Sequence, residues 1–165
     1  MSSASTLNIW KGFCDRVFED TPDTRDYRLR AVDQMYDFTS PVFEQHARNL
    51  DLNPRRILES ILNNPEGISA TQLVSFAFLL PALLLTQDDV RQVNELLDET
   101  YTEAPEHSER QLWMIVFDAM LCAIGTASTT PTPGGNEVAF PSKLSRQWLL
   151  SRCEIGHRRW LLHQV

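Results

Sequence analysis

The sequence predicts an all-α fold, a single-domain bundle of about seven to eight helices over residues 1–165, with one Pro/Gly/Thr-rich loop near residues 126–142. Apolar residues recur at steps of three and four through most of the chain, as in amphipathic helices. Ser, Thr and Asn stand before several of these stretches, where they can act as N-caps. No segment alternates apolar and polar residues for the length of a strand. A chain of 165 residues with 42% hydrophobic residues suits one globular domain.

The first part of the chain predicts four helices. An apolar stripe over residues 10–18 marks the first, which we expect to end at the following Thr-Pro pair. The second begins at Asp23 or Thr24. Ser40-Pro41 predicts the start of a third, because proline is favoured at the first helical position. Asn53-Pro54 repeats the pattern and predicts a fourth.

Two helices, residues 70–85 and 109–124, are expected at the centre of the bundle because both are apolar nearly all round. Residues 73–85 are almost wholly apolar, but a membrane span needs about 20 residues and Pro81 interrupts this run. We therefore expect a buried core helix and no membrane span. Capping boxes are predicted for three pairs: Ser69 with Gln72, Thr86 with Asp89, and Ser108 with Gln111.

The last helix is expected from about Ser142 to the end of the chain, with a bend at Gly156. Gly125 is the expected C-terminal stop of the preceding helix. Between them lies the proline-rich loop, which we predict to be a surface loop. As an alternative, Val138 and Phe140 anchor it to a partner.

The three cysteines, Cys14, Cys122 and Cys153, are widely spaced and odd in number. This pattern argues against a disulfide framework and a structural zinc site, so we expect free thiols; Cys14 and Cys122 lie in apolar helical stripes, where a thiol behaves as a small hydrophobic group. The N-terminal residues lack the charged and apolar regions of a signal peptide. We therefore expect a cytoplasmic protein without a metal or a cofactor.

No catalytic motif is recognisable. The chain has no GxSxG, HExxH, phosphate-binding glycine loop or EF-hand pattern, and its six glycines leave little material for a nucleotide cradle. We therefore predict a non-enzymatic protein. Were the protein an enzyme, His107 with the neighbouring Glu103 and Glu106 would be the first candidates for acid–base chemistry.

The charge is unevenly distributed along the chain. The net charge is -7, and residues 88–110 alone carry -6. This segment predicts a partner-binding surface on an acidic helix, with these residues: Asp88, Asp89, Glu95, Asp98, Glu99, Glu103 and Glu106. The same acids could instead form an ordinary solvated face, or pair within the molecule with the basic C-terminal helix.

Residues 143–165 reverse the balance, with a net charge of +4. They predict a secondary basic face of four residues: Arg152, Arg158, Arg159 and Trp160. Arginines beside a tryptophan could bind phosphate and stack on a base. The acidic composition of the whole chain nevertheless argues against nucleic-acid binding outside this helix.

These observations predict a protein-binding module of the inhibitor or immunity type that acts on a basic partner through its acidic helix. The alternative is a structural or adaptor subunit of a larger protein or nucleoprotein assembly. In that case residues 73–85 or the loop at Val138–Pro141 would be buried against a neighbour.

Overall fold

A computed structural model describes residues 3–19, 21–49, 53–63, 69–127 and 142–164. These residues form seven helices and no strand, which confirms the predicted all-α bundle. In chain order the helices are α1 Ser3–Val17, α2 Pro22–Asn49, α3 Pro54–Leu62, α4 Ala70–Leu83, α5 Gln87–Glu103, α6 Glu109–Ala127 and α7 Lys143–His163. The centre of the predicted loop, residues 128–141, lies outside the described residues, and so do its proposed anchors Val138 and Phe140.

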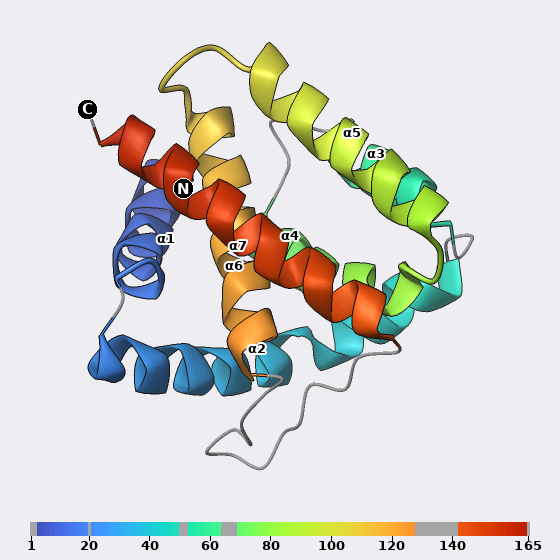
Figure 1. Ribbon diagram of the computed structural model, residues 1–165, viewed down its shortest axis with the longest axis horizontal. Helices are drawn as coiled ribbons and strands as arrows, with labels where there is room; N and C mark the ends of the chain where they lie inside the picture. The colour runs from blue at the N-terminus through green and yellow to red at the C-terminus, as the bar shows by residue number, and fades with distance from the viewer. Residues whose placement is uncertain (1–2, 20, 50–52, 64–68, 128–141, 165) are drawn as a thin grey trace.

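Helix α6 lies at the centre of the bundle, with α7 crossing over it (Figure 1). It contacts α1, α2, α4 and α7, and α5 lies along α3 at the far side from α1. Every residue from Gln111 to Gly125 is buried. Helix α4 is buried along most of its length, so both predicted central helices are confirmed as core elements.

The apolar character of α6 follows from this central place. By length and composition alone the helix could cross a membrane, yet 89% of its most apolar window is buried inside the protein. The apolar run at residues 73–85 is likewise packed inside the bundle except near its end, where Leu85 is exposed. The contacts of both segments are those of core helices.

Two of the three predicted capping boxes form completely, at Ser69 with Gln72 and at Thr86 with Asp89. The third forms in part. The backbone N–H of Gln111 donates to the Ser108 hydroxyl, as in a capping box. The Gln111 side-chain oxygen, however, accepts from the backbone N–H of His107 and not from the backbone N–H of Ser108. Asn53 caps α3 as expected, and Ser142, near which the last helix was expected to begin, caps α7.

The helix boundary predicted at Ser40-Pro41 is wrong, because α2 continues through Pro41 to Asn49. A proline within a helix removes one backbone hydrogen bond, to the carbonyl four residues earlier. Here that carbonyl belongs to Asp37, which is exposed like Pro41, so water can satisfy it. The two helices predicted on either side of Pro41 are therefore one.

Gly125 does not end its helix, since α6 continues to Ala127, and α7 runs through Gly156. Both glycines lie where α6 and α7 approach closely. A methyl group at Gly125 would lie 3.2 Å from Leu149 Cβ, and one at Gly156 would lie 2.6 Å from Asp118 Cβ. The absence of a side chain at these positions allows the two helices to pack together.

The close packing of α6 and α7 also overturns the expectation of three free thiols. Cys122 of α6 and Cys153 of α7 form a disulfide, with a Cα–Cα distance of 4.6 Å. Their separation of 31 residues gave no local signal, because tertiary packing brings them together. Cys14 is free and buried, as expected, and burial raises the pKa of its thiol.

The disulfide predicts the thiol count of the purified protein. Denatured without reductant, the chain is expected to react with one equivalent of a thiol reagent, at Cys14, and with three after reduction. The variant Cys153→Ser should expose two thiols under the same non-reducing conditions. A count of three in the unreduced wild type would show that the bond does not form in solution.

Candidate functional site

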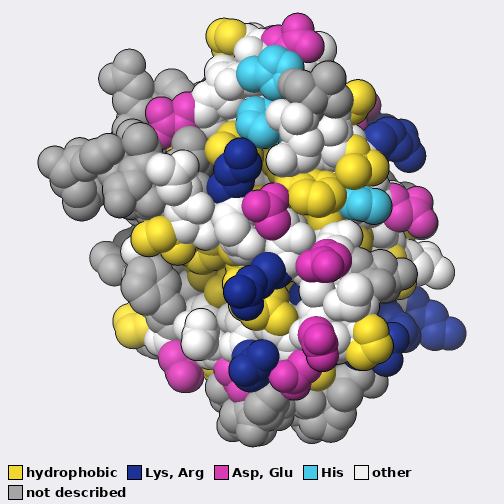
Figure 2. All heavy atoms as spheres, turned by 90° about the vertical axis from the view of Figure 1, so that its left-hand side faces the viewer, with side chains coloured by type: hydrophobic (Ala, Val, Ile, Leu, Met, Phe, Trp, Pro, Cys, Tyr) yellow, Lys and Arg dark blue, Asp and Glu magenta, His cyan; other side chains and the backbone are white. Residues whose placement is uncertain are grey.

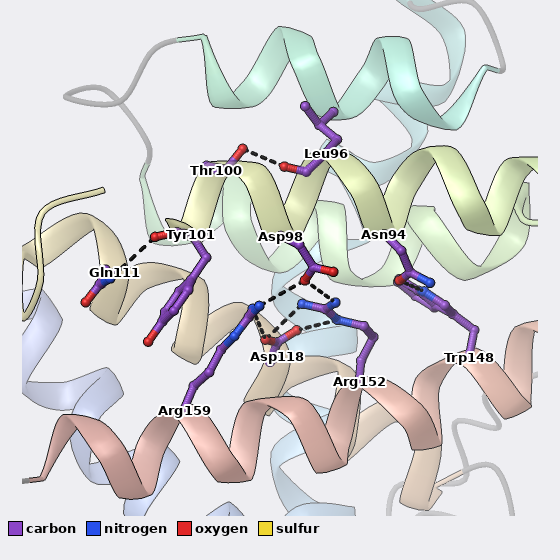
Figure 3. A network of polar contacts seen from close by, with 10 residues as sticks. All are labelled: Asn94, Leu96, Asp98, Thr100, Tyr101, Gln111, Asp118, Trp148, Arg152 and Arg159. Atoms are coloured by element: carbon purple, nitrogen blue, oxygen red, sulfur yellow. Dashed lines mark hydrogen bonds and ion pairs between the residues drawn. The ribbon is translucent and has the colours of Figure 1, made fainter. Parts of the chain in front are cut away.

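A buried ion-pair cluster joins α5, α6 and α7 in the interior (Figure 3). It consists of Asp98, Asp118, Arg152 and Arg159. Asp118 interrupts the apolar run of α6 over residues 112–125, and its side chain and that of Arg152 are both 0% exposed. The guanidinium of Arg152 donates from Nε and Nη2 to the two carboxylate oxygens of Asp118, at 3.0 and 3.2 Å. Such two-point pairing is the strongest geometry available to these groups.

Asp98 and Arg159 complete the cluster on its more open side. One oxygen of Asp98 accepts from Arg152 at 3.0 Å and from Arg159 at 2.9 Å. Arg159 also lies 3.6 Å from Asp118 and stands over the ring of Tyr101, 4.1 Å from its centre. Two acids and two bases balance, so the cluster carries no net charge. A neutral, mutually hydrogen-bonded set of this kind is typical of a structural element.

Burial and pairing act in opposite directions on the pKa values of Asp118 and Arg152. Burial raises the pKa of Asp118, although the guanidinium groups of Arg152 and Arg159 oppose this shift. Burial lowers the pKa of Arg152, but attraction to Asp118 and hydrogen bonds to both aspartates outweigh it, so the net shift is upward. Arg152 therefore remains protonated, and removal of its partner would leave a buried charge.

The cluster is part of a row of polar contacts that connects α5 to α6 and α7. Asn94, Asp98 and Tyr101 follow each other at steps of four and three, so they share one helix face. The indole N–H of Trp148 donates to the Asn94 side chain at 2.7 Å. The side-chain amide of Gln111 donates to the Tyr101 carbonyl at 3.4 Å. These contacts connect the stretch of α5 from Asn94 to Tyr101 to α6 and α7, whereas the helix packs mainly against α3.

The predicted acidic surface is divided by this arrangement. Asp98 is about half exposed (47%), but it pairs with Arg152 and Arg159 of the basic C-terminal helix, which was the internal alternative. Asp89 serves its own capping box at Thr86. Asp88 and Glu95 are exposed but share Arg91, at 2.6 and 3.0 Å. Hydrogen bonds from Arg91 and Gln92 lower the pKa of Asp88.

The remaining predicted acids lie toward the C-terminal end of α5. Glu99, Glu103 and Glu106 are exposed. Within the part of the chain that the structure describes, no Lys or Arg pairs with them; the nearest partner of Glu106 is His107, at 3.8 Å. Glu95, Glu99 and Glu103 are spaced by four residues and form an exposed acidic stripe.

Most of the residues predicted to form the basic face are buried or partly buried. Arg152 is fully buried, which corrects its assignment to a surface, and Arg159 is only 15% exposed. Trp160 is partly buried, and its indole N–H donates to Asp15 of α1 at 2.8 Å. Arg158 alone of the four predicted residues is exposed. The four side chains therefore do not form one surface.

The residues considered for an enzyme come together in part. His107 and Glu106 line a pocket of about 600 Å³ with Tyr101 and His163, but Glu103 is not among the residues that line it. The imidazole rings of His107 and His163 lie 5.3 Å apart. No group of three or more His, Cys, Asp or Glu side chains among the described residues could hold a metal ion.

Sequence reasoning missed Asp118, Asn94 and Trp148. Asp118 could have been noticed as the one charged residue in the apolar run 112–125, since a charge in that setting needs a buried partner. The other two carry no comparable signal. Comparison with protein families, with curated proteins and with solved structures finds no match to this chain.

Proposed function

We propose that the protein is a non-enzymatic binding module that docks on a basic protein partner through the exposed acidic stripe of α5. The observation that supports this most is the placement of Glu99 and Glu103, which are exposed and pair with no described cation, on a helix fastened from behind by the ion-pair cluster. A rigid surface of one charge sign raises the rate of encounter with an oppositely charged protein and suppresses wrong partners.

The exposed acidic stripe destabilises α5. Carboxylates spaced by four residues repel each other, and α5 has no basic residue in its last turn to balance the negative end of the helix dipole. An ordinary solvated face would alternate charges and avoid this conflict. Bound cationic side chains would relieve it, which makes the stripe better suited to a complex than to an isolated protein.

The alternative, an adaptor subunit, depended partly on residues 73–85 being available to a neighbour. Leu73, Val74, Phe76 and Leu80 are all at least 98% buried within the chain, so this segment offers surface mainly at its end, where Ala82 and Leu85 are exposed. The second segment, Val138–Pro141, lies outside the described residues. The binding-module proposal is therefore favoured over the adaptor by the burial of α4.

The conflict within α5 leads to a stability prediction. The double variant Glu99→Lys/Glu103→Lys should increase the free energy of unfolding by about 0.5–1 kcal/mol, because it removes like-charge pairs and places cations at the helix C-terminus. Chemical denaturation at low salt measures this, and the gain should shrink in high salt. A variant less stable than the wild type would show that the two glutamates have stabilising partners.

The proposal is tested by affinity capture of the tagged protein from a lysate of its source cells, at low salt and at about 0.5 M salt, where exposed charges are screened. One stoichiometric basic protein, lost at high salt, is the expected result. Several subunits that persist at high salt would favour the adaptor. If no partner is captured at either salt concentration, both the binding-module and the adaptor proposals are contradicted. Activity would then be sought at the pocket lined by His107.

A further inference from the structure

A groove of about 500 Å³ opens between α1, α2 and the start of α4, away from the acidic stripe. Its floor includes the buried side chains of Phe13, Met35 and Val74. Trp10 and Tyr27 border it, each with its ring near that of Phe13, at 5.4 and 6.1 Å between ring centres. This volume lies within the range of small-molecule sites, about 300–1,000 Å³.

The groove is apolar inside and cationic at its edge. Arg16 and Arg30 both line it and are exposed. Arg30 pairs with Asp26 at 3.2 Å, whereas no carboxylate in the described part of the chain pairs with Arg16. The Arg16 guanidinium lies over the Tyr27 ring, 5.1 Å from its centre. Figure 2 shows the side of the molecule on the left of Figure 1, where α1 lies; basic, acidic and hydrophobic side chains are interspersed on that face.

Two further features fit an aromatic anion. Ile9, at the edge of the groove, is 71% exposed, so apolar surface remains to be covered. Helix α4 begins at Ala70, another lining residue, so the positive end of that helix dipole lies at the same groove. Three aromatic rings favour a planar apolar body, and a guanidinium favours a carboxylate, which it can bind through two hydrogen bonds.

We propose that this groove binds small aryl carboxylates, with the ring against Trp10 and Phe13 and the carboxylate on Arg16. None of the lining residues belongs to α5, so the site is separate from the acidic stripe and does not depend on the function proposed for it.

The test is a titration of the full chain with 2-naphthoate and, in parallel, with its neutral counterpart 2-naphthamide. Binding is followed by the indole N–H signal of Trp10 in ¹H–¹⁵N spectra, assigned through Trp10→Phe. We expect saturable binding of the carboxylate with a Kd of about 1 mM or tighter, and binding of the amide about tenfold weaker. The amide comparison uses the unaltered protein and so is independent of any folding defect.

Arg16→Gln should weaken 2-naphthoate binding by about tenfold and leave 2-naphthamide unchanged. Arg146→Gln is the matched control, because Arg146 is an exposed arginine on α7 that does not line the groove. The proposal is overturned if the Trp10 signal does not saturate, or if acid and amide bind equally. It is overturned as well if the two arginine variants weaken binding to the same extent.

Discussion

Replacing Asp118 with alanine is expected to lower the free energy of unfolding by about 3–5 kcal/mol, the usual effect of removing one partner from a buried ion pair. Arg152 is 0% exposed and would keep its charge with only Asp98 to pair with. Denaturation in urea, followed by far-ultraviolet circular dichroism, measures the change. Asp37→Ala is the matched control, since Asp37 is exposed on α2, and it should have little effect.

A double variant separates pairing from packing in the cluster. In Asp118→Leu/Arg152→Met both charges are gone and the volume is largely kept, so the loss of stability should be much smaller than the sum of the two single losses. The remaining Arg159 and Asp98 still pair, at 2.9 Å. Additive losses, or single variants that each change stability by less than about 1 kcal/mol, would contradict a paired buried cluster.

Gly156→Ala is the second substitution with a large expected effect. An alanine methyl group there would lie 2.6 Å from Asp118 Cβ and 3.1 Å from Phe18 Cζ, so α7 would have to move away from the ion-pair cluster. We expect a loss of about 1–3 kcal/mol, typical of overpacking. Helix propensity alone predicts the opposite effect for this substitution, an increase of about 1 kcal/mol in the free energy of unfolding.

Gly12→Ala provides the control for this prediction. Gly12 lies in α1, and a methyl group there would meet nothing within 4 Å. Its replacement should stabilise the protein by about 0.5–1 kcal/mol, as expected for a glycine in an open helix. If Gly156→Ala were stabilising to the same degree in thermal or chemical denaturation, the close contact between α6 and α7 would be wrong.

The helices were predictable because their signals are local. The apolar period, the capping residues at Ser69 and Thr86 and the apolar run of α6 each depend on residues a few positions apart. The failures at Pro41 and Gly125 have one cause. Proline and glycine are strong local markers of helix ends, but an exposed carbonyl or a close helix contact can keep them inside a helix.

The candidate site was less predictable because it depends on which helices pack together. Asp98 and Arg152 are 54 residues apart, and Cys122 and Cys153 are 31 apart. The composition correctly predicted one acidic and one basic helix. It gave no information about which of their charged side chains pair with each other. Asp98 pairs with the largely buried Arg159, whereas Glu99 and Glu103 are exposed and pair with no described Lys or Arg.

The most direct test of the proposed function is a quantitative comparison of three tagged baits in one capture experiment at low salt, read by mass spectrometry. The baits are the wild type, Glu99→Lys/Glu103→Lys, and the control Asp37→Lys/Glu154→Lys, which makes the same change in charge at exposed positions outside α5. We predict that a basic partner is recovered equally by the wild type and the control and is lost with the α5 variant. Equal recovery by all three baits, or equal loss with both variants, would contradict docking through the exposed acidic stripe.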